Sequence, residues 1–250
     1  MTDSRSTAPV ALVTGSTSGI GEAVARRLAQ DGFVVVIHSR QSVAAGQSLA
    51  RALGGHYRSA DLADDAQRTR LIDEVISTCG RLDVLVNNAG ISRVIAHDDL
   101  SAATPDIWQS LYEVNVIAPF RLVSAAAPFL RHAATARGRP ACIINISSHA
   151  GVRPKGASLP YSASKAALNH VTRLLALTLA PSIRVNAVAP GLVDTPMTQD
   201  WDQARALWQT HSPMRRAARP DDIAQIVSSL VASDYLTGEI IVADGGLNLR

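Results

Sequence analysis

Short apolar runs rich in β-branched residues alternate along this chain with longer amphipathic segments, and this alternation limits the possible folds more than any other feature. Strands inside a parallel sheet are continuous hydrophobic runs, whereas the helices that connect them have one apolar face. The alternation therefore predicts an α/β fold with a doubly wound parallel sheet and helices on both faces. The predicted strands are residues 10–14, 33–37, 56–59, 84–86, 142–146, 184–188 and 240–242. The predicted helices are residues 19–31, 41–53, 64–78, 105–134, 162–179 and 221–232.

Length and composition favour a single domain. With 250 residues, 47% of them hydrophobic and 18% charged, the chain can bury a large core. No linker, internal repeat or low-complexity stretch interrupts the alternation. We therefore expect residues 10–250 to form one domain behind a flexible N-terminal tail, residues 1–9.

Composition also argues against several classes of function. The formal net charge is only +3 and the arginines are scattered, so we expect no nucleic-acid partner. The apolar runs are far shorter than the roughly 18 residues of a membrane span, so we expect no membrane association. Neither cysteine, Cys79 or Cys142, lies in a C-x-x-C pair or near clustered histidines, which argues against a disulfide framework and a metal site. The N-terminus lacks a signal-peptide pattern, so a cytoplasmic protein is expected.

A glycine-rich segment, Thr-Gly-Ser-Thr-Ser-Gly-Ile-Gly from Thr14 to Gly21, follows the first predicted strand and opens the first predicted helix. Glycines let the backbone approach a pyrophosphate, and the amides and dipole of a helix N-terminus attract its negative charge. The spacing is G-x-x-x-G-x-G, and its flanking strand and helix favour a Rossmann-type dinucleotide site over a purely structural turn. The candidate phosphate-binding residues are Gly15, Thr17, Ser18, Gly19, Ile20 and Gly21.

The end of the second predicted strand bears on the choice of nucleotide. In a dinucleotide site, an acidic residue there selects the free 2′-hydroxyl of NAD(H). This chain has His38, Ser39 and Arg40 instead, and a guanidinium can pair with the 2′-phosphate of NADP(H). NADP(H) is therefore the predicted cofactor, with NAD(H) possible; the alternative is that Arg40 is a solvated surface cation. Asp61 and Leu62 follow the third predicted strand, where they could border the adenine ring or form a simple turn.

Tyr161 and Lys165 are four residues apart, so one helical face presents both. An ammonium group near a phenol favours the phenolate, which predicts that the pKa of Tyr161 is lowered from about 10 towards neutrality. Ser147 and Ser148 end a central predicted strand, at the edge where open α/β sheets bind ligands. A hydroxyl there could donate a hydrogen bond to an oxygen that gains negative charge, or could simply cap the strand end.

In these motifs the chain resembles the short-chain dehydrogenase/reductase family, from Val10 to about Gly246. The matching segments follow the family's order and spacing: residues 14–21, Asp61, residues 87–90 (Asn-Asn-Ala-Gly), Asn115, Ser148, Tyr161-x-x-x-Lys165, Pro190-Gly191 and residues 244–246 (Asp-Gly-Gly). The resemblance implies a single NAD(P)-binding catalytic domain of the Rossmann type. It also implies hydride transfer between NADP(H) and a small-molecule carbonyl or alcohol substrate.

The resemblance also assigns roles to individual residues. It implies that Tyr161 is the acid/base, that Ser148 orients and polarises the substrate oxygen, and that Tyr161 and Lys165 contact the cofactor, Lys165 at the nicotinamide ribose. Asn115 is implied to support a proton-relay water, and Asn87 to brace neighbouring strands. The remaining implied cofactor contacts are Asn88, Ala89 and Gly90 on the adenosine side, and Pro190, Gly191, Val193 and Thr195 near the nicotinamide carboxamide. Many relatives that prefer NADP(H) have a basic residue at the position of Ser18, so the predicted preference depends mainly on Arg40.

The substrate is the least constrained property. The family's 3-oxoacyl-[acyl-carrier-protein] reductases are similar in length and in residues 236–239, which makes a 3-oxoacyl thioester one candidate, but enzymes for sugars, steroids and simple alcohols share these features. Arg153 and Lys155 near the expected site could attract an anionic substrate or could be solvated surface cations. Residues 192–219, with Trp201 and Trp208, are predicted to form a mobile lid with one or two short helices.

Two other functions stay open: a non-catalytic redox sensor that binds NADP(H), and an assembly protein that uses the fold without a cofactor. The complete set of catalytic positions favours the enzyme. Members of the family are commonly homotetramers, so we expect a homo-oligomer joined through the predicted helices 105–134 and 162–179. The alanines of residues 125–127 would permit close helix packing between subunits, although burial within one subunit would look the same.

Overall fold

The structure, a computed structural model, describes residues 8–249, and in this range seven strands form one parallel sheet. The strands are β1 (Val10–Val13), β2 (Val34–Ser39), β3 (His56–Ser59), β4 (Val84–Asn87), β5 (Ala141–Ile146), β6 (Ile183–Pro190) and β7 (Ile240–Ala243). Their order in the sheet is β3-β2-β1-β4-β5-β6-β7, and every neighbouring pair is parallel. The predicted doubly wound sheet and all of its predicted strands are confirmed. Residues 1–7 of the predicted tail lie outside the described residues.

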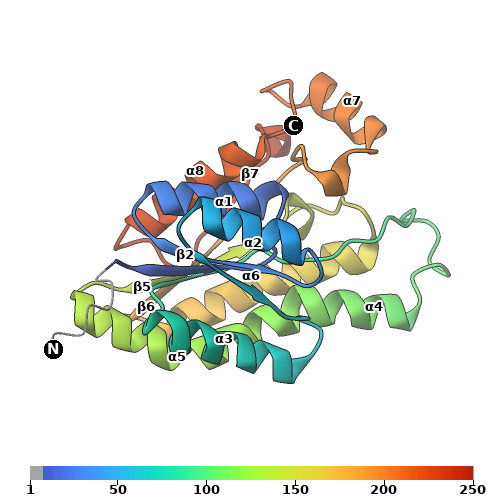
Figure 1. Cartoon of the computed structure of the whole chain (residues 1–250). Coiled ribbons are helices and arrows are strands. Elements are labelled where there is room, and N and C mark those ends of the chain that lie inside the picture. Colours follow the sequence, from blue (N-terminus) through green and yellow to red (C-terminus); the bar gives the residue numbers. More distant parts are fainter. Residues whose placement is uncertain (1–7, 250) are drawn as a thin grey trace, which may run out of the picture.

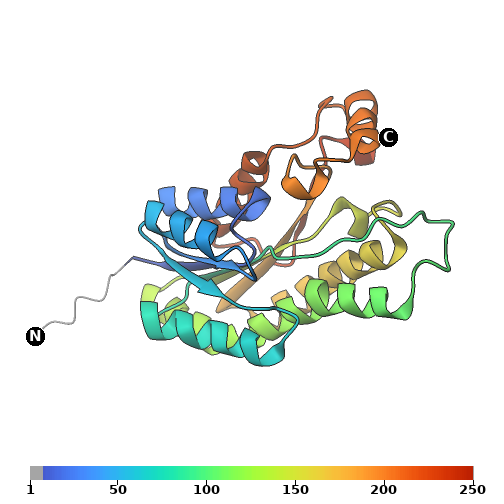
Figure 2. The same cartoon turned by 45° about the vertical axis from the view of Figure 1, so that its right-hand side comes forward.

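Helices cover both faces of the sheet (Figures 1 and 2). One face carries α1 (Gly19–Gln30), α2 (Val43–Ala52) and α8 (Pro220–Ala232), and the other carries α3 (Asp65–Cys79), α5 (Ala118–Arg137) and α6 (Leu159–Leu179). The strands supply side chains to both faces in turn, because successive residues of a strand point to opposite sides. Leu12 and Ile143 therefore lie in the core beneath α3 and α5, whereas Val13 and Ile144 lie in the core beneath α1 and α8.

The predicted helix 105–134 is divided into three segments. α4 (Pro105–Tyr112) runs into a π-helical turn, η1 (Glu113–Ile117), and α5 follows it. By length and composition alone, the whole stretch Pro105–Arg137 could cross a membrane, a property that the short apolar runs of the sequence did not suggest. However, 44% of its most apolar window is buried inside the protein. Leu122 and Leu130 of α5 belong to the core on α3 and the sheet, so we assign this stretch to the core of the domain.

Residues 192–219 leave the sheet after β6 and return at α8. They contain the short helix η3 (Pro196–Thr198) and α7 (Asp202–His211), and a parallel bridge between Val193 and Ala218 closes the base of the excursion. α7 buries none of its residues and projects away from the sheet (Figure 2). The predicted loop with short helices is confirmed, and its movement as a lid stays a prediction.

His38 on β2 connects the turn after β1 to the rest of the sheet. The buried ring accepts a hydrogen bond at Nδ1 from the Gly15 amide (3.1 Å), and Nε2 lies 3.1 Å from the Ala60 carbonyl oxygen. The two contacts require a neutral ring with its proton on Nε2. Burial lowers the pKa of His38 to about 4, so the ring is neutral at physiological pH.

We expect this histidine to make the fold sensitive to mild acid. Unfolded His38 takes up a proton near its ordinary pKa of 6.5, whereas the folded protein resists protonation down to a pKa of about 4. The free energy of unfolding should therefore fall as the pH drops from 6.5 to about 4, with a contribution on the order of 3 kcal/mol. Urea denaturation across this pH range measures it. In the His38→Gln variant, whose amide can both accept and donate, the free energy of unfolding should depend less on pH over this range. An unchanged pH dependence would show that His38 is not responsible for it.

Candidate active site

The predicted phosphate loop has the geometry of an anion-binding turn. Gly15 (φ +61°) and Gly19 (φ +55°) adopt left-handed conformations that favour glycine. A Cβ atom on Gly21 would lie 2.3 Å from the Gly15 carbonyl oxygen and 2.4 Å from Nδ2 of Asn88. Ser18, the N-cap of α1, makes no side-chain capping bond, so the amides of the first helical turn stay available to a bound phosphate. These residues fit the diphosphate of a dinucleotide.

Thr14 and Asn88 join this loop to the segment after β4. Oγ1 of Thr14 accepts hydrogen bonds from the amides of Asn88 and Ala89, both at 3.0 Å. The Asn88 side chain donates to the carbonyl oxygens of Thr14 and Gly15, both at 2.9 Å. β1 and β4 are the neighbours at which the strand order reverses, and such a reversal opens a ligand-binding crevice in an α/β sheet. The side chain of Asn88 thus shapes the crevice, and its contact with adenosine stays a prediction.

Arg40 and Asp61 lie together at the expected adenosine end. The guanidinium Nη1 is 3.8 Å from the Asp61 carboxylate; the Arg40 side chain is exposed, and that of Asp61 is partly buried. Asp61 also accepts a hydrogen bond from the Ala63 amide, which holds the carboxylate in the turn before α3. The Asp61 carboxylate would therefore compete with a 2′-phosphate for the Arg40 guanidinium. The sequence did not reveal this contact.

Tyr161, Lys165 and Ser148 meet at the carboxyl end of β5. Helix α6 begins at Leu159, before the predicted residue 162, and its first turn contains Tyr161. The Lys165 ammonium lies 5.9 Å from the centre of the Tyr161 ring and donates a hydrogen bond to the Ile146 carbonyl oxygen (2.9 Å). Ser147 and Ser148 both border a cleft with Tyr161. The hydroxyl of the buried Ser147 donates to the Lys165 carbonyl oxygen, whereas the Ser148 hydroxyl accepts a hydrogen bond from the Ala150 amide and keeps its own proton free to donate. Tyr161 and Lys165 therefore lie on one side of α6, as predicted, and Ser148 is the serine whose hydroxyl is available to a ligand.

The predicted effect of Lys165 on Tyr161 is not what the protein alone produces. Burial raises the pKa of Tyr161, and a hydrogen bond with Ser148 acts in the opposite direction. Burial also lowers the pKa of Lys165 to about 8. The prediction of a lowered phenol pKa is wrong for the free protein, because desolvation disfavours the charged form of both groups. Tyr161 is thus a protonated phenol near neutral pH.

Asn115 lies in the π-helical turn η1 and is almost fully buried. Its Nδ2 donates to the Ile91 carbonyl oxygen (3.0 Å) and Ser164 Oγ (3.1 Å), and its Oδ1 accepts from the Ile91 amide (3.0 Å). A Cβ atom on Gly90 would lie 3.1 Å from Oδ1 of Asn115 and 3.4 Å from Nζ of Lys165. The turn therefore places Asn115 close to Lys165, and a side chain at position 90 would crowd both groups.

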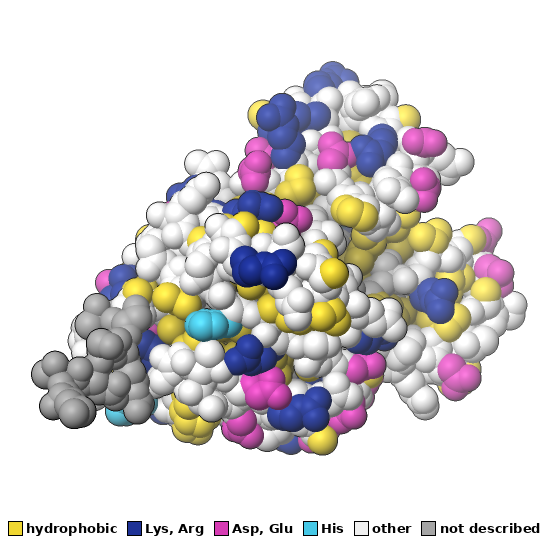
Figure 3. Space-filling model, viewed as in Figure 1, with side chains coloured by type: hydrophobic (Ala, Val, Ile, Leu, Met, Phe, Trp, Pro, Cys, Tyr) yellow, Lys and Arg dark blue, Asp and Glu magenta, His cyan; other side chains and the backbone are white. Residues whose placement is uncertain are grey.

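A cleft of about 970 Å³ opens beside these residues. Figure 3 shows the surface hollowed between the projection that carries α7 and the body of the protein, with hydrophobic side chains gathered there. Predicted site residues in its walls are Ile20, Ser148, Tyr161, Pro190, Gly191, Val193 and Thr195. Its apolar walls otherwise include Val94, Ile95, Met197, Trp201, Leu207 and Trp208. The cleft thus joins the expected nicotinamide end of the cofactor site to an apolar chamber.

His149 is a wall residue that the sequence analysis missed. Its buried ring has Nε2 3.6 Å from the Asp244 carboxylate and meets the Trp208 ring of α7 edge-on. Burial lowers the pKa of His149, with the Asp244 charge acting in the opposite direction. Its position directly after Ser148 was the available signal. Arg153, a candidate anion ligand in the sequence, instead donates to the side chain and carbonyl oxygen of Asn248.

The cysteines lie apart, Cys142 buried in β5 and Cys79 half-buried at the end of α3. Within residues 8–249, no group of three or more histidine, cysteine, aspartate or glutamate side chains could hold a metal ion.

Comparison with known proteins identifies the family. Residues 15–248 match a family model described as enoyl-(acyl carrier protein) reductase. A protein of Streptomyces violaceoruber, assigned by its name as ketoacyl reductase 2 of the granaticin polyketide synthase, is 48% identical over 97% of both chains.

Solved structures extend the match to the fold. The RhlG/NADP active-site complex of Pseudomonas aeruginosa has a TM-score of 0.88 at 35% identity and covers 99% of both chains. A 3-ketoacyl-(acyl-carrier-protein) reductase from Brucella melitensis, complexed with NADH, has a TM-score of 0.87 at 32% identity and covers 96% of this chain and 98% of its own. The chain therefore belongs to the short-chain dehydrogenase/reductase family of oxidoreductases.

Proposed function

We propose that this chain is an NADP(H)-dependent reductase that delivers a hydride to a ketone and a proton to its oxygen, with Tyr161 as the proton donor. The observation that carries the proposal is the meeting of Tyr161, Lys165 and Ser148 at the carboxyl end of β5, beside a cleft whose walls include Tyr161, Ser148 and Ile20 of the glycine-rich segment. The relatives are named as reductases and dehydrogenases, which favours an enzyme over a redox sensor or an assembly protein.

The proposed mechanism assigns a separate task to each side chain. Bound nicotinamide supplies the hydride. Ser148 donates a hydrogen bond to the substrate oxygen and stabilises the negative charge that develops there. Tyr161, protonated because burial raises its pKa, then transfers its proton to that oxygen. Lys165 binds the nicotinamide ribose and stabilises the phenolate that remains, and Asn115 supports the water that returns a proton to the pair.

Arg40 supports the preference for NADP(H). An exposed guanidinium at the end of β2 can pair with a 2′-phosphate, and the neutral His38 beside it does not repel either cofactor. Asp61 weakens this argument, since it lies within 3.8 Å of Arg40, and NADH is bound by one of the solved relatives. We therefore propose a preference rather than exclusive use of NADP(H).

A 3-oxoacyl thioester is the proposed substrate. Two relatives are named as ketoacyl or 3-oxoacyl-[acyl-carrier-protein] reductases, and these names describe the reduction of such compounds. The apolar chamber beside Ser148 also suits an acyl chain more than a sugar. Reduction is the proposed direction, because a protonated Tyr161 is ready to donate. We also propose that the enzyme acts in the cytoplasm, since the composition and the free cysteines suit a reducing compartment.

Replacement of Tyr161 by phenylalanine tests the proposed function. Tyr161→Phe removes only the transferable proton, so kcat for NADPH-dependent ketone reduction should fall by about 100-fold to 10,000-fold. NADPH binding, measured by fluorescence titration, should change little. Tyr235→Phe is the matched control, because Tyr235 is 95% exposed and remote from the cleft. Substantial residual turnover in Tyr161→Phe would remove this residue from its proposed role.

Replacement of Arg40 tests the cofactor preference. Arg40→Ser removes the partner of the 2′-phosphate, so the KM for NADPH should rise by about tenfold or more while the KM for NADH stays nearly constant. Steady-state kinetics with both cofactors measure the change. Arg51→Ser, an exposed arginine on α2, is the control for lost surface charge. Equal changes with the two cofactors would show that Arg40 does not recognise the phosphate.

We also propose a homo-oligomer, in the form of a tetramer, joined through α5 and α6. The outward faces of these helices expose large apolar side chains, including Phe120, Leu174 and Leu177, the last of them 82% exposed. Light scattering should give the mass of a tetramer for the wild type and smaller species for Leu177→Glu. Leu100→Glu, at an exposed leucine outside both helices, should leave the mass unchanged. A monomeric wild type would refute this proposal.

A further inference from the structure

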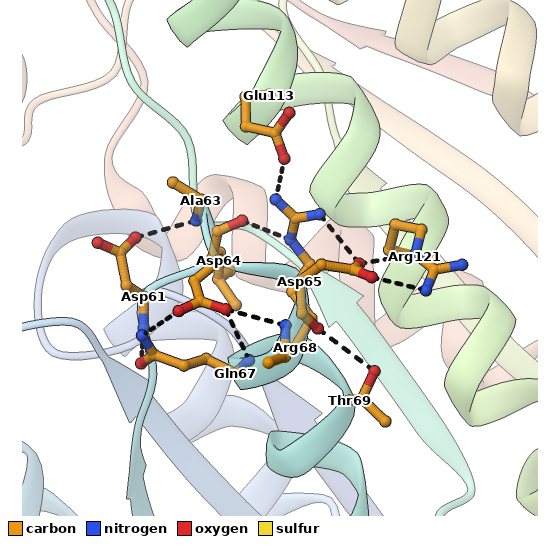
Figure 4. Close-up of polar contacts among 11 residues, drawn as sticks. Asp61, Ala63, Asp64, Asp65, Gln67, Arg68, Thr69, Glu113 and Arg121 are labelled. Carbon is orange, nitrogen blue, oxygen red and sulfur yellow. Dashed lines mark hydrogen bonds and ion pairs between the residues drawn. The ribbon is translucent and has the colours of Figure 1, made fainter.

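The guanidinium of Arg68 on α3 is buried, with only 2% of the residue exposed. Nε donates to the Leu62 carbonyl oxygen (2.6 Å), Nη1 to the Asp65 carboxylate (3.3 Å) and Nη2 to the Glu113 carboxylate. Figure 4 shows the guanidinium between Asp65 and Glu113, with α3 and the π-helical turn η1 brought together around it. Arg68 therefore contacts three separate points of the chain.

Burial of an arginine is costly unless its donors are paired with acceptors and counter-charges. The other residues that α3 buries are Leu71, Ile72 and Val75, and an apolar side chain at position 68 could pack with them. Replacement of a buried ionic group by an apolar residue is often neutral or stabilising, so stability alone is a weak reason for an arginine at position 68. The contacts of Arg68 give a stronger reason.

The contacts of Arg68 lead to two parts of the proposed active site. Leu62 and Asp61 form the turn that is expected to border the adenine ring. Glu113 is the first residue of the π-helical turn η1, and Asn115 lies two positions later in the same turn. One planar guanidinium thus links the adenine side of the cofactor site to the turn that holds Asn115 beside Lys165.

We propose that Arg68 is a positioning residue that holds the adenine-side turn and the Asn115 turn in a fixed relation to each other. The proposal rests on the proposed function, because it uses the roles assigned there to the cofactor site and to Asn115. The carboxylate of Glu113 anchors the turn, the Asn115 amide bonds to Ile91 and Ser164, and Gly90 lies between Asn115 and Lys165. A shift of the turn would therefore change the position of Asn115 relative to Lys165.

The same network contains a matched control. Arg121 of α5 makes two hydrogen bonds to the Asp65 carboxylate, at 2.7 and 2.8 Å, and its side chain is 42% exposed. It shares Asp65 with Arg68, but its hydrogen bonds reach neither Leu62 nor Glu113. Loss of Arg121 therefore weakens the link between α3 and α5 without releasing either turn.

The experiment compares Arg68→Met, Glu113→Ala and Arg121→Gln with the wild-type chain. We measure the affinity for 2′,5′-ADP, which reports the adenosine side alone, the kcat of ketone reduction with saturating NADPH, and the thermal midpoint. Arg68→Met should lose about tenfold in both affinity and kcat, because both turns are released. Glu113→Ala should lose kcat by about the same factor and keep its affinity for 2′,5′-ADP, since only the Asn115 turn is released. Arg121→Gln should keep both values.

A purely structural role would lower the thermal midpoint without this separation of affinity from turnover. The proposal is overturned if Arg68→Met keeps wild-type affinity and kcat, if Arg121→Gln loses as much as Arg68→Met, or if Glu113→Ala loses nucleotide affinity. Should Arg68→Met not fold, Arg68→Lys, which keeps the charge but not the three-way contact, must show losses in both values. A wild-type chain that neither binds nor oxidises NADPH would refute the proposed function itself, whereas an active wild type with an equally active Arg68→Met refutes only the positioning role.

Discussion

A parallel sheet covered by helices on both faces directs its polar chemistry to the strand ends, because its interior is apolar on both sides. The strand order reverses between β1 and β4, so the connections that follow these two strands diverge to opposite faces. The Thr14 hydroxyl joins the two strand ends through the amides of Asn88 and Ala89. The crevice, the glycine-rich loop and the cleft all depend on this one junction.

Desolvation governs the electrostatics of the candidate site. It raises the pKa of Tyr161, lowers the pKa of Lys165 to about 8 and lowers the pKa of His38 to about 4. All three shifts favour the neutral form of a group that would be charged, or chargeable, in water. Because the pKa of the phenol rises and that of the ammonium falls, the two values move apart and their order in water is reversed. Tyr161 therefore keeps its proton until a substrate oxygen accepts it.

Polar networks outside the cleft tie its parts to the scaffold. His38 holds the phosphate loop to β2 and β3, and Arg68 joins α3 to the π-helical turn of Asn115. Each such side chain is buried and hydrogen-bonded, which makes it costly to misplace. These hydrogen bonds keep the functional groups of the site in position, whereas α7 in the projection buries none of its residues.

The sequence alone was sufficient for the strands, most helix bounds, the glycine-rich loop and the Tyr161–Lys165 pair, because local periodicity and short spacings encode them. It could not show the π-helical turn inside residues 105–134, the wall position of His149, the Arg40–Asp61 contact or the direction of the Tyr161 pKa shift. Each of these depends on burial and on neighbours that are distant in the chain. Burial of an ionisable group, and the identity of its partner, are decided only when the tertiary structure brings those segments together.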